Sequence, residues 1–293
     1  MPLGANDEGD DSTPVEEGYE WLSDRAAKAI NDLTSIDIGP EAAILADDQF
    51  FHPIFRTVSQ DVAQCLLSAL DHLRFLVWSL KTRDKPYPYA QATLIRTAIT
   101  GAATALWMVS PTEAIERRCR AMEFMFIDLK SQLTWMDTAA EQPMNRYRPA
   151  AEWAQFQQMQ AEMKRRQEWI LQQASTLLSP DTPFTRKTYG RTVTSDSDIV
   201  KAAGAITPAL GMGGWDPERV LLGSWRVLSG YAHARPWAVA LGSTIVVTDP
   251  EPHPTTGRIT VAAEGNPDRL LDMAFRAMVV VETGVRRLEK LSQ

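Results

Sequence analysis

The feature that most constrains the fold of this chain is the helical spacing of its apolar residues. It is clearest between residues 110 and 137, where an apolar side chain recurs every three or four positions without a break. Residues at this spacing lie along one face of an α-helix, and that face has to be buried against another element. The seam consists of Ile115, Cys119, Met122, Phe126, Leu129, Leu133 and Met136. It predicts a long amphipathic helix over these residues.

Similar seams predict further helices along the chain, and only one short region has the character of β-structure. The predicted helices cover about 16–33, 53–82, 89–109, 150–178, 195–207, 216–235 and a last segment from about 266. Residues 243–248 and 258–262 are rich in β-branched side chains and flank a proline-rich connection, which is typical of a β-hairpin. The sequence therefore predicts an all-α fold, a multi-helix bundle with one small β-hairpin near the C-terminus.

Composition gives the expected domain organisation and location. Residues 1–15 form an acidic stretch that cannot bury enough apolar surface to become ordered, and we expect a disordered tail there. Residues 16–293 are predicted to form a single helical-bundle domain, with a helical-hairpin excursion at about 111–178 and the β-hairpin at about 243–262. The first residues lack the basic and apolar regions of a secretion signal, so we expect a cytoplasmic protein with no membrane contact.

Charge and motif content exclude several classes of function. The formal net charge is −7, so any contact with nucleic acid has to be local. Cys65 and Cys119 have neither metal-ligand nor redox spacing and are expected to be reduced thiols. Asp47 and Asp48 superficially resemble an aspartate-rich magnesium motif, but no further acid follows at the required position. We therefore interpret them as a solvated acidic turn, and we predict no metal site and no cofactor.

The stretch from residue 216 to residue 237 carries the strongest functional signal. Asp216 is suited to cap a helix that begins at Pro217, and the helix is expected to end at Arg235 and Pro236. One face of this helix is made of small residues, at which another helix can approach closely: Gly223, Val227, Gly230 and Ala234.

A second face of the same helix is polar and carries Arg226, Ser229 and His233. Arg226 and His233 are two turns apart, which is about 10.5 Å along the helix axis. A guanidinium holds a phosphate through its planar fork of donors, and an imidazole transfers protons near neutral pH. We therefore predict that this face grips a phosphodiester and assists attack on it by a neighbouring hydroxyl, without a metal.

An arginine followed by a histidine within a few residues, near the end of a late helix in an all-helical protein, resembles the HEPN superfamily. The resemblance rests on Arg226, six intervening residues and His233, in the setting SWRVLSGYAHARPW. It implies a homodimeric helical bundle in which two such helices face each other and cleave RNA without a metal. In that case Arg226 would orient the scissile phosphate, and His233 would act as general acid or base. A role in defence or as a toxin, with an antitoxin or other partner protein, is also implied.

Four basic residues outside this helix are candidates for binding the RNA substrate. Arg96 stands in the apolar helix expected at 89–109, where a charge needs a partner. Arg186, Lys187 and Arg191 are clustered in residues 179–194, which read as a loop. For Arg96, a structural ion pair or a position at the rim of the bundle is the alternative interpretation.

The alternative function is that of a non-catalytic helical interaction or scaffold protein that retains the fold. Val227 favours it, because active members of the HEPN superfamily usually carry a polar residue directly after the arginine. Under this interpretation Arg226 and His233 are helix-terminal groups that bind backbone carbonyls or a nearby acid such as Glu282.

Overall fold

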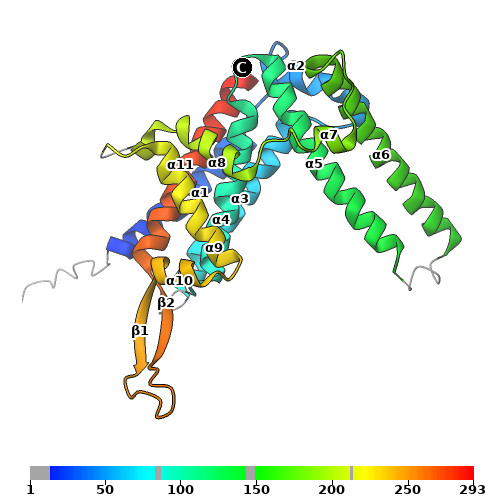
Figure 1. The fold of residues 1–293 in the computed structure, drawn as a ribbon. Helices are drawn as coiled ribbons and strands as arrows, with labels where there is room; N and C mark the ends of the chain where they lie inside the picture. The colour runs from blue at the N-terminus through cyan, green and yellow to red at the C-terminus, as the bar shows by residue number, and fades with distance from the viewer. Residues whose placement is uncertain (1–13, 83–86, 143–148, 212–213) are drawn as a thin grey trace, which may run out of the picture. The chain divides into compact units, whose positions relative to one another are not determined.

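The computed structural model describes residues 14–82, 87–142, 149–211 and 214–293. Within these residues the fold consists of eleven α-helices and one antiparallel pair of strands (Figure 1). This confirms the predicted class, an all-α bundle with a small hairpin near the C-terminus. Of the acidic tail predicted at 1–15, residues 1–13 lie outside the described residues, and the next two already belong to the first helix.

The elements predicted from the sequence occur in the predicted order, and the structure adds short helices between them. The helices are α1 (Pro14–Thr34), α2 (Ala43–Phe50), α3 (Val58–Lys81), α4 (Ala90–Val109), α5 (Ala114–Ala140), α6 (Ala150–Leu178), α7 (Arg186–Tyr189), α8 (Asp196–Ala205), α9 (Pro217–Ala232), α10 (Pro236–Gly242) and α11 (Pro267–Ser292). The 3-10 turns are η1 (His52–Ile54) and η3 (Pro208–Gly211), and the strands are β1 (Ser243–Asp249) and β2 (Thr260–Gly265). Their bounds lie within a few residues of the prediction for most elements.

Contacts between residues divide the chain into two compact units. The first unit comprises Met1–Ile36, Gln64–Thr104 and Val200–Arg286. The second unit comprises Asp37–Ala63, Ala105–Ile199 and Arg287–Gln293. The first unit therefore contains α1, α9, α10, both strands and most of α11, whereas the second contains α2, α5, α6 and α7.

The core of the first unit is formed where apolar seams of its helices meet. The fully buried side chains include Leu22 of α1, Leu70 of α3 and Met278 of α11. Helix α4 approaches α3 closely at Gly101, because a Cβ atom there would lie 2.8 Å from the carbonyl oxygen of Cys65. The small side chains of α4 thus allow a close approach of the two helices.

Helix α4 is also long and apolar enough to cross a membrane, as judged from length and composition alone. Its most apolar window of 18 residues has a mean hydropathy of 1.3, and 61% of that window is buried by the rest of the protein. The buried core helix of a water-soluble protein gives the same result.

The two strands form an antiparallel hairpin that extends away from the helices of the first unit (Figure 1). Ser243 pairs with Gly265 and Val247 with Val261, and the register shifts between Val247 and Asp249. The second strand runs over Thr260–Gly265, whereas the β-branched run predicted it at 258–262. Residues 258 and 259, which were predicted to begin the strand, instead belong to the loop between β1 and β2. In this loop the amide of His253 donates to the carbonyl of Arg258 at 2.8 Å.

The second unit contains a buried ion pair where the sequence predicted a solvated acidic turn. Asp47 is 0% exposed and Arg117 is 2% exposed, and the guanidinium Nε donates to the Asp47 carboxylate at 2.6 Å. Arg118 donates to the other carboxylate oxygen at 2.9 Å. The prediction of a solvated turn is therefore wrong, because α5 places two guanidinium groups against α2. Both arginines therefore link α5 to α2 within the second unit.

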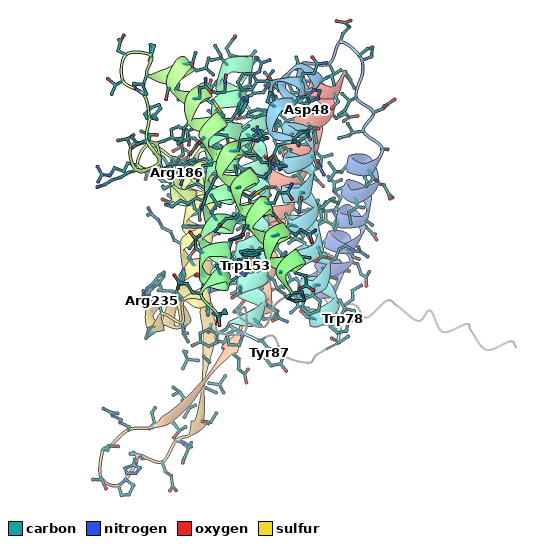
Figure 2. The ribbon with its side chains drawn as sticks, turned by 90° about the vertical axis from the view of Figure 1, so that its right-hand side faces the viewer. Asp48, Trp78, Tyr87, Trp153, Arg186 and Arg235 are labelled. Atoms are coloured by element: carbon teal, nitrogen blue, oxygen red, sulfur yellow. The ribbon has the colours of Figure 1, made fainter. Side chains whose placement is uncertain are left out.

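Asp48 is also buried and helps to define the start of α3 (Figure 2). Its carboxylate accepts hydrogen bonds from the Ser59 amide at 2.9 Å and from the Ser59 hydroxyl at 2.5 Å. Helix α3 begins at Val58 and not at Pro53 as predicted, because η1 and a left-handed Phe55 (φ 53°) come between them. Burial raises the pKa of Asp48 above its ordinary value, and the hydrogen bonds from Ser59 oppose that shift.

Candidate functional site

Helix α9 begins as its sequence predicts and ends earlier. The Asp216 carboxylate accepts from the Glu218 amide at 3.1 Å, and Pro217 is the first helical residue. The helix ends at Ala232, with His233 as its C-cap, and Ala234 adopts a left-handed conformation (φ 51°). The amide of Arg235 donates to the carbonyl of Gly230 at 2.7 Å. This is a Schellman ending, which satisfies terminal carbonyls that the predicted end at Pro236 would have left to water.

The left-handed Ala234 makes a testable difference to stability. An L-residue in this conformation is strained by about 1–2 kcal/mol, and glycine avoids the strain. We expect Ala234→Gly to raise the free energy of unfolding by about 1 kcal/mol, as measured by urea denaturation followed by circular dichroism. Ala232→Gly is the matched control, because the same change inside the helix should lower stability by about 0.5–1 kcal/mol. Equal effects of the two changes would contradict the assigned ending.

One side of α9 packs against α4 through two polar contacts. The indole nitrogen of Trp225 donates to the Thr100 hydroxyl at 2.9 Å. Arg96 Nε donates to the Ser229 hydroxyl at 2.9 Å, and the Arg96 guanidinium lies 5.3 Å from the centre of the Trp225 ring. Arg96 therefore contacts the Ser229 hydroxyl and the face of the Trp225 ring. Among the described residues no carboxylate pairs with it. The structure thus brings Arg96 to the predicted polar face of α9.

Arg226 and His233 are both exposed on the opposite side of α9 from its buried residues Leu221 and Leu228. Across the part of the chain that the structure describes, neither side chain has a hydrogen-bond or ion-pair partner. Glu282, the acid considered as an alternative partner, is instead held by Arg25 through two hydrogen bonds of 2.5 and 2.6 Å. The imidazole and the guanidinium are therefore both available to a ligand.

Ser229 lies between these two groups, one turn from each along the helix. It is half-buried, and its hydroxyl oxygen is occupied by the hydrogen bond from Arg96. The site thus consists of two exposed groups, Arg226 and His233, and a hydroxyl that is anchored to a third cationic residue. A hydroxyl that already accepts from a guanidinium is better suited to hold Arg96 in place than to act as a nucleophile.

The other three predicted substrate-binding residues lie in the second unit. Arg186 and Lys187 belong to α7, a single helical turn within residues that were expected to be a loop, and Arg191 follows it. The turn forms because Thr185 and Thr188 make a capping box and Tyr189 is buried at its end. All three basic residues are exposed, and Arg186 pairs with Glu168 at 3.2 Å. Their role toward a substrate stays a prediction.

The small-residue face of α9 has two different environments. At Gly230 a Cβ atom would lie 2.6 Å from the Cβ of Ala238, so α10 approaches α9 as the spacing predicted. At Gly223 a Cβ atom would meet nothing within 4 Å. Gly223 instead lines a cleft between α9 and α11, which periodicity within a single helix could not indicate.

The described residues contain no group of three or more His, Cys, Asp or Glu side chains able to hold a metal ion. Cys65 and Cys119 form no disulfide with each other, which agrees with the prediction of reduced thiols.

The fold and the site together define an all-α bundle protein whose helix α9 presents an arginine and a histidine that have no side-chain partner among the described residues. No protein-family model, curated protein or solved structure matches the chain.

Proposed function

We propose that this chain is a HEPN-like endoribonuclease whose helix α9 binds an RNA phosphodiester and cleaves it without a metal ion. The observation that supports this most is the pair of exposed groups on α9, Arg226 and His233, which have no partner among the described residues. An exposed arginine and histidine two turns apart on one helix are suited to contact neighbouring parts of one nucleotide.

The proposed reaction is transesterification at phosphorus. A general base removes the proton of the ribose 2′-hydroxyl, the 2′-oxygen attacks phosphorus, and the bond to the 5′-oxygen breaks as a general acid protonates that oxygen. The products are a 2′,3′-cyclic phosphate and a 5′-hydroxyl. Arg226 neutralises the charge that builds up on the non-bridging oxygens. In a homodimer the two copies of His233 supply the base and the acid.

The surface around the site suits that assembly. Arg226 and His233 are both exposed on α9, and neither side chain has a partner among the described residues. A second copy related by a two-fold axis would convert an open face into a groove with two guanidinium groups and two imidazoles, as the HEPN resemblance implies.

The proposal is tested by incubating purified protein with RNA in excess EDTA and analysing the ends of the products. We expect fragments with cyclic-phosphate and 5′-hydroxyl ends. Cleavage that requires an added divalent metal, or RNA that stays intact at high protein concentration, would contradict the proposal.

A non-catalytic interaction protein is the second candidate, and one observation favours it. Val227, which follows Arg226, is half-buried and lines the cleft between α9 and α11. It leaves Arg226 without the polar neighbour that is usual in active HEPN members. Intact RNA, together with a stable assembly that survives His233→Ala, would favour this candidate.

A further inference from the structure

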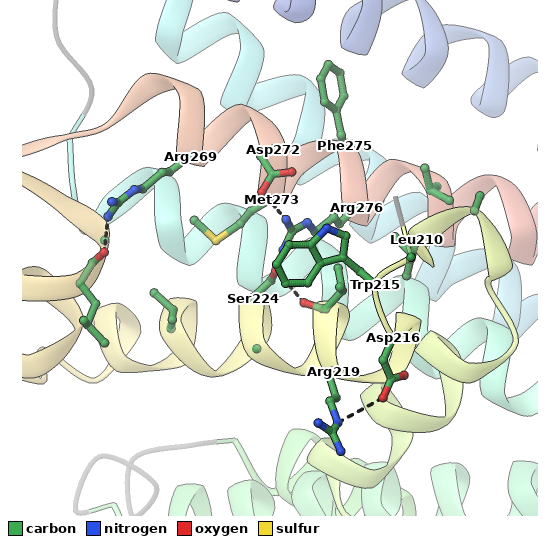
Figure 3. Close-up of a pocket in the computed structure, with 18 residues that line it drawn as sticks. Leu210, Trp215, Asp216, Arg219, Ser224, Arg269, Asp272, Met273, Phe275 and Arg276 are labelled. Carbon is green, nitrogen blue, oxygen red and sulfur yellow. Dashed lines mark hydrogen bonds and ion pairs between the residues drawn. The ribbon is translucent and has the colours of Figure 1, made fainter. Parts of the chain in front are cut away.

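We infer that the cleft between α9 and α11 is a binding site for a small organic anion with an apolar or aromatic body. The cleft lies wholly within the first unit and has a volume of about 930 Å³ (Figure 3). That volume is at the upper end of the range of small-molecule sites in proteins. The inference does not depend on Arg226 or His233, neither of which lines the cleft.

The cleft is walled mainly by apolar side chains. Val220 and Val227 come from α9, Met273 and Val279 come from α11, and Trp215 reaches in from the segment before α9 (Figure 3). Trp215 is 71% exposed although it is one of the largest apolar side chains of the unit. An indole at the mouth of an apolar cleft is typical of sites that cover the flat or extended body of a ligand.

The polar groups of the cleft favour an anion. Three arginines and two aspartates line it, so its local charge is positive although the net charge of the chain is −7. Arg276 Nη1 donates to the Ser224 hydroxyl at 2.7 Å, and Nη2 pairs with Asp272 at 2.5 Å. These contacts fix the guanidinium and leave its remaining N–H groups available. A guanidinium held in this way is pre-organised to bind a carboxylate or phosphate.

Arg269 adds a second positive charge at the end of the cleft where α10 meets β1. Its guanidinium donates to the backbone carbonyl of Leu241. Within the described chain no carboxylate forms an ion pair with it. The third arginine, Arg219, pairs with Asp216 at 3.2 Å at the mouth of the cleft and is largely exposed. The excess charge therefore comes from Arg269, and Arg276 supplies the fixed donor.

The glycine at position 223 is independent evidence that the cleft is kept free of side chains. A glycine in the middle of a helix destabilises it relative to alanine, so its presence needs a reason. Close helix packing is the usual reason, but here a Cβ atom would meet nothing within 4 Å. Because Gly223 lines the cleft, a side chain at this position would occupy the space that a ligand needs.

The test uses 1-anilinonaphthalene-8-sulfonate, an aromatic anion whose fluorescence rises in an apolar site, titrated into the full chain. We expect saturable binding of one molecule per chain. Arg276→Gln should weaken it about tenfold or more, because a charge-assisted hydrogen bond is lost. Arg286→Gln, an exposed arginine farther along the same helix, should leave the dissociation constant within about twofold.

Gly223→Leu separates loss of the site from loss of the fold. It should occupy the space beside α9 and weaken saturable binding about tenfold or more while raising the midpoint of thermal unfolding, since leucine favours the helix. The uncharged analogue N-phenyl-1-naphthylamine should bind about tenfold more weakly than the sulfonate. Displacement by AMP would identify an aromatic phosphate as the ligand class, and displacement by decanoate an aliphatic carboxylate. Binding that is unchanged in both variants, or equal for the neutral probe, would overturn the inference.

Discussion

Replacing His233 with alanine is expected to lower the rate of RNA cleavage by about 100- to 10,000-fold, the usual contribution of a positioned general acid or base. The imidazole is exposed and has no partner among the described residues, so its removal breaks no internal contact. The free energy of unfolding should therefore change by no more than about 0.5 kcal/mol. The measurement is the single-turnover rate on a labelled RNA in EDTA, together with a urea denaturation curve.

His253→Ala is the matched control for that experiment. His253 is also exposed, and it lies in the connection of the β-hairpin, away from α9 in sequence. Its replacement should leave the cleavage rate within about twofold. If both variants cleave like the wild type, the imidazole of α9 has no role in the chemistry. If both lose activity equally, the loss does not report on the site.

Replacing Asp47 with asparagine is expected to lower the free energy of unfolding by about 3–5 kcal/mol, the largest effect on stability that we predict. The change removes the carboxylate that both Arg117 and Arg118 contact. Arg117 is 2% exposed, so its charge would be left buried without a compensating anion. The measurement is the free energy of unfolding from urea denaturation at neutral pH.

Asp48→Asn is the matched control, because it also replaces a buried carboxylate with an amide, at the adjacent residue. Asp48 binds Ser59 and none of the guanidinium groups of α5, so we expect a change of about 1 kcal/mol or less. Burial raises the pKa of Asp48 above 3.8, so the folded state binds the proton more tightly than the unfolded state. The stability that this carboxyl contributes is therefore present at low pH and is lost as the pH rises through the raised pKa. The wild type should gain stability relative to Asp48→Asn as the pH falls from neutral toward 4. Losses of similar size in the Asp47 and Asp48 variants at neutral pH would contradict the assigned roles.

The elements that follow from local spacing could be predicted from the sequence. A seam reports on its own helix face regardless of what covers it, and the residues from Cys119 to Met136 predicted the buried face of α5. Ile115, the first residue of the predicted seam, is instead 59% exposed. The start of α9 was also predictable, since Asp216 and Pro217 act on their own first turn. The end of α9 was not, because Ala234 adopts a conformation that its residue type disfavours.

Contacts between segments distant in sequence could not be predicted. Asp47 and Arg117 are 70 positions apart, and nothing near Asp47 in the sequence indicates that two guanidinium groups cover it. The same holds for the cleft, which exists only because α9 and α11 pack at Ser224 and Arg276. Gly223 was the one local sign of it, and its spacing could be read equally well as a helix-packing position.

The candidate site could be predicted only in part. Helical spacing placed Arg226, Ser229 and His233 on one side of α9, but spacing gives no information on what lies opposite them. The hydrogen bond from Arg96 to Ser229 joins residues 133 positions apart, so the partner that Arg96 required could not be identified beforehand. Arg226 and His233 have no such partners in the part of the chain that the structure describes, and this depends on all the surrounding elements.

The most direct test of the proposed chemistry uses a DNA oligonucleotide that contains a single ribonucleotide. If the 2′-hydroxyl is the nucleophile, the protein should cut this strand in EDTA only at the phosphodiester that follows the ribonucleotide, and leave a 2′,3′-cyclic phosphate. The fully deoxy strand should stay intact. Cutting of the deoxy strand, or no cutting of the ribonucleotide strand under conditions in which it is bound, would contradict the assignment of Arg226 and His233 to metal-independent RNA cleavage.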